Sequence, residues 1–350
     1  MARIYLDYNA TAPLRPEART AMIAAMDEVG NPSSVHQEGR AAKMIMERAR
    51  EQVAVAMGAQ AADIVFTSGA TEAAALCLAG AKVHCSHIEH EAVSANCIVD
   101  QAVDVMGAVD VTCPEQSTLQ LANSETGIIQ DLPEGLFASD MTQAFGKIPV
   151  AFDWSGTQMA MLSAHKLGGP KGVGALVLKK GTDIAAQLRG GGQEMGRRSG
   201  TENIIGIAGF GAAAEASARD LDAGVWGKVE KLRNILENAI AQSSNRTIFV
   251  GNTANRLPNT TCMITPGWKG ETQVMQMDLA GLAVSAGSAC SRGKVKSSRV
   301  LIAMGYSEAD AACALRVSLG PTTSEEDVMT FVEKWTCAYE KFMARQGANV

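Results

Sequence analysis

The spacing of apolar residues predicts alternating strands and helices along most of the chain. Residues 36–57 carry apolar side chains three or four positions apart, which is typical of an amphipathic helix with one face on a core. From residue 63 onward, short apolar runs alternate with helical patterns and with turns that contain glycine. This alternation predicts an α/β fold in which a mostly parallel sheet is covered by helices on both faces.

The same pattern gives expected bounds for the elements. We expect helices at 16–29, 36–57, after Thr71, after His90, and over 201–243 with an interruption at 224–227. The expected strands of this part are 64–67, 82–86, 109–112, 119–122, 136–140, 159–163 and 174–179. Further on we expect strands at 248–250, 260–264, 283–286 and 315–319, and helices at 272–279, 298–304 and 325–344.

These elements fall into two groups, which predict two domains. We expect a large α/β domain over 16–245 and a smaller C-terminal α+β domain over 246–350, while residues 1–15 form an N-terminal segment that joins the small domain. A chain of 350 residues is long enough for one large or two modest domains.

Composition and charge narrow the kinds of partner. Hydrophobic residues make up 47% of the chain and charged residues 19%, which fits a globular core. The net charge is −6 and no run of basic residues occurs, which argues against nucleic acid or a membrane surface as the main partner. We find no signal peptide and no apolar stretch long enough to cross a bilayer, so we expect a cytoplasmic protein.

The cysteines and histidines do not predict a metal site. None of the eight cysteines is spaced C-x-x-C, and disulfides are not expected without a secretory signal. Most of the cysteines lie in apolar runs, but Cys290 lies among small residues and is followed by basic ones. The histidines at 84, 87 and 90 fall across a change from strand to loop, so we expect no metal there.

A candidate catalytic lysine follows the predicted strand 159–163. Lys166 stands between that buried strand and a turn through Gly168 and Gly169. Desolvation at such a place lowers the pKa of a lysine, and a neutral amine is what a Schiff base with an aldehyde cofactor requires. The alternative is a surface lysine beside a Gly-Pro turn.

Two other places support the Schiff-base interpretation. Asp140 ends a predicted strand, and the carboxyl ends of parallel strands line the ligand crevice of an α/β sheet. A carboxylate there would keep the ring nitrogen of pyridoxal phosphate protonated, although such an Asp can also cap a helix. Residues 67–72 read as a strand end, a turn of small residues and a helix start, which is a favourable site for phosphate.

Ten stretches in order carry a resemblance to a known family. They are residues 5–11, 31–36, 68–72, 89–93, 123–127, 163–172, 190–194, 198–201, 285–290 and 316–320. Together they resemble the cysteine desulfurases, which are fold-type I pyridoxal-phosphate enzymes of the class V aminotransferase group. The resemblance implies that the large domain binds the cofactor and holds a sheet of the seven-stranded type, sandwiched by helices.

The resemblance also implies roles for the residues around the cofactor. Lys166 would carry pyridoxal 5'-phosphate as a covalent aldimine and later remove the substrate Cα proton, and Asp140 would pair with the ring nitrogen. Gln143 would bond the phenolic oxygen of the ring. The implied phosphate ligands are Ala70, Thr71, Ser163 and His165, with Thr201 reaching the phosphate of a neighbouring subunit, so a homodimer is expected.

His90 and Arg316 are further candidates with structural alternatives. The resemblance implies that His90 stacks on the ring and moves protons, whereas an isolated histidine is often only structural. Arg316 is an isolated charge in an apolar strand pattern, and a buried guanidinium needs a partner. A substrate α-carboxylate would meet that need by a bidentate contact, and a structural ion pair is the alternative.

Cys290 distinguishes a desulfurase from other members of the group. A thiolate there would attack the substrate sulfur, form a persulfide, release alanine and pass the sulfur to an acceptor or iron–sulfur scaffold protein. Basic residues at 292, 294 and 296 favour the thiolate. The alternative is a passive exposed cysteine.

The chain departs from the family in two places. Where this chain has Ser124, the family usually has a second asparagine, and that asparagine touches the ring oxygen or the substrate carboxylate. Because Ser124 is shorter, weaker substrate binding is expected. The region 100–137 is short, and 131–136 leaves no room for a crossover helix. Either the connection is an unusually tight one or the strands are joined differently. Alternative functions are a selenocysteine lyase or another class V lyase or aminotransferase, and a sulfur-transfer scaffold without turnover.

Overall fold

The computed structural model describes residues 3–287 and 297–347. Its strands are β1 (Ile4–Tyr5), β2 (Ala62–Thr67), β3 (His84–Ser86), β4 (Ile98–Gln101), β5 (Ser139–Asp140), β6 (Met159–Ser163), β7 (Gly174–Lys179), β8 (Ile248–Phe249), β9 (Thr260–Ile264), β10 (Leu282–Ala283), β11 (Ser285–Ala286) and β12 (Ala314–Ser318). Its α-helices are α1 (Pro16–Met26), α2 (Gln37–Ala56), α3 (Ala70–Leu78), α4 (Glu91–Ser94), α5 (Ile204–Asp222), α6 (Val225–Ser243), α7 (Gly270–Leu279), α8 (Arg299–Ala303), α9 (Glu308–Ala311) and α10 (Glu325–Gly347).

A mixed sheet forms the centre of the larger part of the chain. Its strands follow the order β2-β7-β6-β5, with β7 antiparallel to both neighbours and β5 parallel to β6. The extended segment 117–121 lies beyond β5 and links it to β3, which pairs in parallel with β4. Seven extended segments therefore lie in one row among the described residues, and β7 is the antiparallel exception in the predicted mostly parallel sheet.

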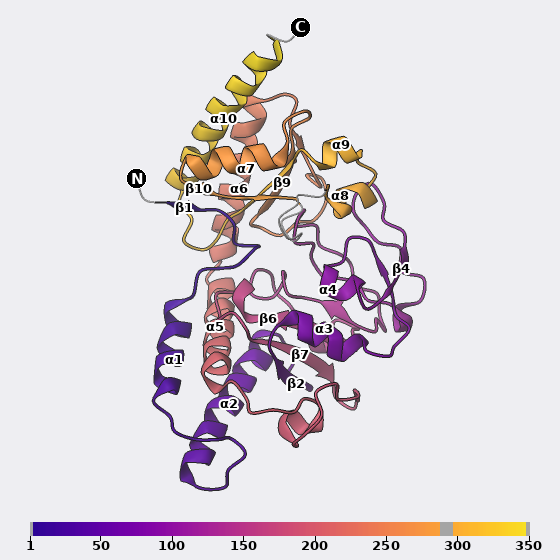
Figure 1. Cartoon of the computed structure of the whole chain (residues 1–350), viewed down its shortest axis with the longest axis vertical. Coiled ribbons are helices and arrows are strands. Elements are labelled where there is room, and N and C mark those ends of the chain that lie inside the picture. The colour runs from indigo at the N-terminus through magenta and orange to yellow at the C-terminus, as the bar shows by residue number, and fades with distance from the viewer. Residues whose placement is uncertain (1–2, 288–296, 348–350) are drawn as a thin grey trace.

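The two faces of this sheet have separate cores. Alternate residues of a strand point to opposite faces, so Ile64 and Phe66 contact one cluster and Val65 the other. Helices α2 and α5 cover the first face, and α3 covers the second (Figure 1). The burial of Ala42, Met46, Ala49 and Val53 confirms the apolar stripe expected on α2. This arrangement is the predicted α/β sandwich.

A second sheet lies in the C-terminal part of the chain. Strands β11-β12-β9-β8 are all antiparallel and pack with α6, α7 and α10 around an aromatic cluster that includes Trp268 and Trp335. The N-terminal strand β1 pairs in parallel with β10, so the N-terminal segment joins this C-terminal part of the chain (Figure 1). The domain bounds at residues 15 and 245 stay a prediction.

Several predicted bounds were wrong in the region after His90. The expected helix there is a single turn, α4, and β4 follows where no strand was expected. The expected strand 109–112 is reduced to one bridge between Val103 and Val109. These segments are short and partly polar, and β4 is determined by pairing with β3 rather than by local apolar spacing. Helix α9 was also missed, for the same reason of length.

The shortened region 100–137 takes the tighter of the two connections considered. The parallel segments 117–121 and β5 are joined without an α-helix, through a turn closed by a bridge between Ala122 and Ile129. Gly135 then turns the chain with φ of 80° and donates its N–H to the carbonyl of Gly156. The connection is therefore a loop held by backbone hydrogen bonds.

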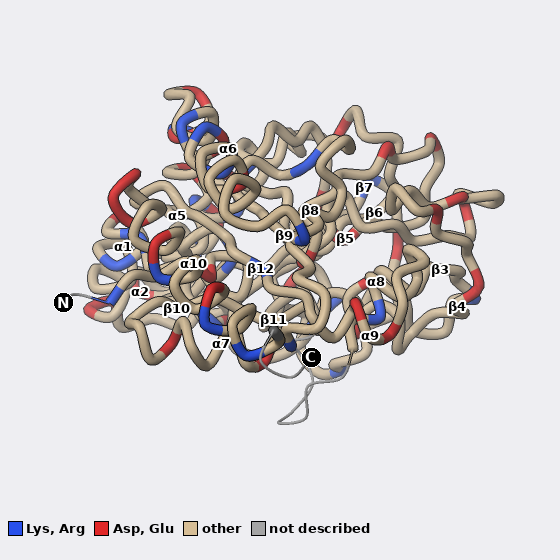
Figure 2. The backbone as a smooth tube through the Cα atoms, turned by 90° about the horizontal axis from the view of Figure 1, so that it is seen from above, with Lys and Arg blue, Asp and Glu red and all other residues tan. Residues whose placement is uncertain are grey.

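The distribution of charge and the character of the helices both bear on possible partners of the chain. Basic positions are scattered among acidic ones along the described chain (Figure 2). No helix within residues 3–287 and 297–347 combines the length and apolar character needed to span a bilayer.

Candidate active site

A cavity of about 650 Å³ lies where the N-terminal segment, the loops after β2, β5 and β6, and β12 meet. Most of the candidate residues line it. They are Ala70, Thr71, His90, Ser124, Asp140, Gln143, Ser163, His165, Lys166 and Arg316. The fold therefore gathers side chains from distant parts of the sequence around one space.

Lys166 ends a short 3₁₀ turn directly after β6. Its Nζ is partly buried and donates to the backbone carbonyls of Asn9 at 2.7 Å and Ala10 at 2.9 Å. The N-terminal segment thus crosses over the lysine and fixes its direction. The alternative of a surface lysine beside a turn does not describe this environment.

His165, the neighbour of Lys166, is held in the neutral form. Burial and the positive charges of Lys166 and Lys171 lower the pKa of His165 to about 4. Its Nδ1 lies 3.1 Å from the Thr11 hydroxyl, and its carbonyl accepts the N–H of Ala12 at 2.8 Å. A neutral imidazole can offer one donor and one acceptor to a ligand.

Asp140 ends β5, next to β6 in the sheet, so it faces the same cavity as Lys166. Its Oδ1 accepts the backbone N–H of Thr142 at 2.9 Å, which forms a local turn. No α-helix begins at this point in the described chain, so the helix-cap alternative does not apply. The carboxylate remains partly exposed to the cavity.

At the turn before α3, the backbone passes very close to the start of β7. Gly69 has φ of 155°, and a Cβ on Gly174 would lie 2.6 Å from the Gly69 Cα, so both positions require glycine. The turn leads into the first N–H groups of α3 beside Ser163. Free N–H groups, a hydroxyl and a neutral imidazole form a donor set suited to phosphate.

The donor set as a whole fits pyridoxal phosphate. Phosphate donors lie at one side of the cavity, a carboxylate ends β5, and a lysine follows β6. Each group matches one part of that cofactor: its phosphate, its ring nitrogen and its aldehyde.

Gln143 and His90 also line the cavity with defined hydrogen bonds. Gln143 Nε2 donates to the Asn9 carbonyl at 3.0 Å. His90 is the N-cap of α4, and its Nδ1 accepts the Ala92 N–H at 3.1 Å. Because Nδ1 accepts this hydrogen bond, the ring proton of His90 lies on Nε2.

Arg316 lies in β12 with only 5% of its surface exposed. Its guanidinium donates to Asp7 Oδ1 at 2.8 Å and to the Ser124 carbonyl at 3.0 Å. The structural ion pair that was considered as an alternative is therefore present. Within the described residues its Nε has no hydrogen-bond partner, and the residue lines the cavity, so a further acceptor is needed.

Glu89, Asn9 and Lys147 were missed by the sequence analysis as parts of this site. Glu89 is 2% exposed, and burial together with nearby Asp140 raises its pKa to about 8. Asn9 and Lys147 are buried in a hydrogen-bond network beneath Lys166 and Gln143. Lys147 follows an apolar run, a signal of the kind that identified Arg316.

Two candidates lie outside this geometry. Thr201 is exposed and does not line the cavity, and its role toward a neighbouring subunit stays a prediction. Cys290 and the basic residues 292, 294 and 296 lie outside the described residues. On either side of them, the Ser298 hydroxyl donates to Glu125, and a Cβ on Gly287 would lie 3.3 Å from the same carboxylate.

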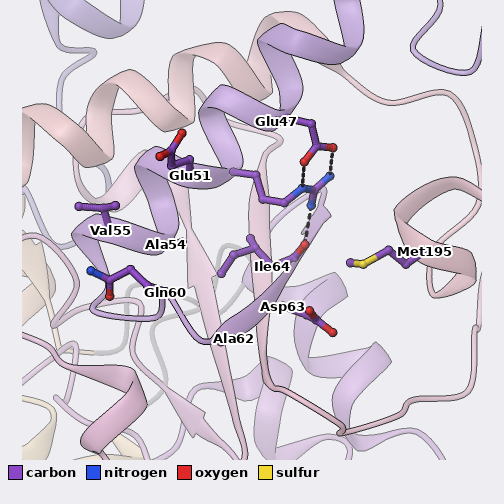
Figure 3. A pocket seen from close by; sticks show the side chains of 10 residues that line it. Glu47, Glu51, Ala54, Val55, Gln60, Ala62, Asp63, Ile64 and Met195 are labelled. Atoms are coloured by element: carbon purple, nitrogen blue, oxygen red, sulfur yellow. Dashed lines mark hydrogen bonds and ion pairs between the residues drawn. The ribbon is translucent and has the colours of Figure 1, made fainter. Parts of the chain in front are cut away.

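A second hollow, of about 380 Å³, lies between α2 and β2, away from these residues (Figure 3). Arg50 lines it and contacts Glu47, the carbonyl of Ile64 and both carboxylate oxygens of Glu194. Glu194 also accepts the N–H of Phe66 at 2.8 Å and has φ of 48°. Arg50, Glu47 and Glu194 at this hollow therefore already have partners within the chain.

Comparison with known proteins gives one consistent result. The model of the family Aminotransferase class-V matches residues 4–106 and 113–331. A cysteine desulfurase of Cereibacter sphaeroides is 38% identical over 95% of both chains, and "Cysteine desulfurase IscS" of Dictyoglomus turgidum is 36% identical over 93% of this chain and 91% of its own. The X-ray structure of a NifS-like protein from Rickettsia africae superposes with a TM-score of 0.88 at 32% identity, covering 97% of this chain and 99% of that one. This chain belongs to the class V aminotransferase family.

Proposed function

We propose that this chain is a cysteine desulfurase that holds pyridoxal phosphate through Lys166. Membership of the class V aminotransferase family implies this cofactor, and relatives that span almost the whole chain carry the desulfurase name. The observation that carries the proposal is the shared cavity of Lys166, Asp140 and the phosphate donors of Ser163 and His165.

Each cofactor-binding residue has a defined task. Lys166 Nζ would hold the aldehyde carbon, Asp140 the ring nitrogen, and Gln143 Nε2 the phenolic oxygen. The phosphate would be held by Ala70, Thr71, Ser163 and His165, with Thr201 supplied by the second subunit of a homodimer. Bound there, the cofactor supplies an electron sink for charge that develops at the substrate Cα.

The remaining residues act on the substrate cysteine. Arg316 binds its carboxylate with the N–H that lacks a partner, and Ser124 lines the same space. Lys166 Nζ removes the Cα proton, and His90 Nε2 can exchange a proton at the substrate sulfur.

Cys290 completes the reaction. Its thiolate would attack the substrate sulfur and break the carbon–sulfur bond, whose electron pair goes to carbon; that carbon takes up a proton from a general acid, so alanine leaves and Cys290 holds a persulfide. The outer sulfur then passes to an acceptor protein, and the IscS name of one relative supports an iron–sulfur scaffold as that acceptor.

The test is sulfide release from L-cysteine in the presence of a thiol reductant. Lys166→Ala should abolish both release and the visible absorbance near ~420 nm, whereas Cys290→Ala should abolish release and keep the absorbance. Cys337→Ala, which removes an exposed cysteine on α10, is the matched control and should retain both. Full sulfide release by Cys290→Ala would contradict the proposal.

A further inference from the structure

Lys147 is a buried lysine beneath the cavity, with 2% of its surface exposed. Its Nζ donates to Gln143 Oε1 at 2.6 Å and to Asn9 Oδ1 at 2.9 Å. Within residues 3–287 and 297–347, no carboxylate forms an ion pair with it. Burial and the charges of Lys166 and Arg316 lower the pKa of Lys147 well below its ordinary value. Two N–H groups of this amine therefore meet two amide oxygens.

The contact with Lys147 determines which way the Gln143 amide points. Because Lys147 donates to one end of the amide, that end is the oxygen, and Nε2 must lie at the other end. There Nε2 donates to the Asn9 carbonyl at 3.0 Å. A reversed amide would place Oε1 against the Asn9 carbonyl, so that two acceptors would face each other. Lys147 thus makes Gln143 a donor on the cavity side.

The other contact of Lys147 reaches Lys166 through a single residue. Asn9 accepts Lys147 at its side-chain oxygen and Lys166 at its backbone carbonyl, 2.7 Å from Nζ. The side chain of Asn9 is further held by Asn259 at 3.0 Å and by Thr260 at 2.8 Å. The two lysines are therefore linked through opposite ends of one buried asparagine.

We propose that Lys147 is a positioning residue of this active site. It fixes the Gln143 amide and the Asn9 backbone, and so determines which hydrogen-bonding groups the cavity presents beside Lys166. The proposal rests on the proposed function. Gln143 uses one N–H on Asn9 and has a second N–H for a ligand, so the site presents a donor and selects a ligand with an acceptor oxygen at that point. Lys147 itself does not line this cavity.

A double-mutant cycle on the full chain tests this mechanism. Lys147→Met removes the donor and keeps the length and burial of the side chain, and Gln143→Ala removes the amide. We measure the dissociation constant of pyridoxal phosphate by absorbance titration after removal of bound cofactor. Each single variant should weaken binding by roughly 3–10-fold, the value of one hydrogen bond, and the loss in the double variant should be smaller than the product of the two single losses.

The controls separate positioning from stability. Arg233→Met removes another buried cation, 7% exposed and outside the cavity, and should lower the thermal midpoint without changing cofactor affinity. Losses that multiply in the double variant, or wild-type affinity of Lys147→Met, would overturn the proposal. If Lys147→Met does not fold, Gln143→Glu replaces the donor by an acceptor, and unchanged affinity there would refute the polarity argument. A wild-type chain that binds no cofactor would instead refute the proposed function.

Discussion

Glu89 should make the folded chain lose stability as the pH rises. The residue is buried beside Asp140, and one of its oxygens, Oε2, has no hydrogen-bond partner among the described residues. Its pKa is raised from 4.5 to about 8, mainly because burial penalises the charged form. Since the folded state holds the proton more tightly than the unfolded state, the contribution of Glu89 to stability is greatest below about pH 4.5 and falls until about pH 8.

Glu89→Gln removes this titration and keeps the acceptor for the N–H of Gln120. Each pH unit corresponds to about 1.4 kcal/mol, so the stability of the variant relative to wild type should rise by on the order of 4 kcal/mol between pH 4.5 and 8. Urea unfolding followed by tryptophan fluorescence at several pH values, at constant cofactor concentration, measures the difference. Glu91→Gln, an exposed carboxyl two residues away, is the control. A difference that stays constant across this range would refute the reasoning.

Three further predictions concern other charged groups. Glu194→Gln should lower the free energy of unfolding by about 3 kcal/mol, because it leaves the Arg50 guanidinium without its buried partner. Glu47→Gln, at the exposed side of Arg50, should lower it much less, and equal urea midpoints of the two variants would contradict this. Arg316→Lys should raise the KM for L-cysteine by roughly tenfold with a smaller change in kcat, since one ammonium group cannot keep the contacts with Asp7 and the Ser124 carbonyl and also donate to the substrate carboxylate, and unchanged KM would exclude the substrate role. His165→Gln should reduce the stability that the chain loses between pH 6.5 and 4, because the folded wild type keeps His165 neutral there while the unfolded chain takes up a proton. Unfolding curves of both proteins at pH 4.5 and 7 measure this loss, and an equal loss in the variant and the wild type would refute the prediction.

The sequence predicted the elements whose own residues determine them. Strands β6, β7 and β9 have the bounds expected from their apolar runs, and the long helices α2, α5 and α6 follow from spacing and from the glycine between the last two. The region after His90 could not be predicted in the same way. There β4 is defined by pairing with β3, and the segment 117–121 by its neighbours on both sides, which local spacing does not reveal.

The candidate site shows the same division between local and distant causes. Lys166, Asp140 and the turn before α3 stand at strand ends, so the pattern predicted that they meet at one edge of a sheet. Asn9 comes from the N-terminal segment, which pairs through β1 with the C-terminal part of the chain, so local spacing around Lys166 does not reveal this contact. Lys147 likewise has its hydrogen-bond partners in Asn9 and Gln143, and the apolar residues near it in the sequence do not reveal them.

The outer side of β2 limits how this chain can associate with others. Arg50 occupies the carbonyl of Ile64, and Glu194 occupies the N–H of Phe66, so side chains already take the backbone groups that a new strand would use. A second copy or an acceptor protein cannot lengthen the sheet by adding a strand along this edge, because these backbone groups already have hydrogen-bond partners. On this side of the sheet, contacts with other proteins must therefore form through side chains.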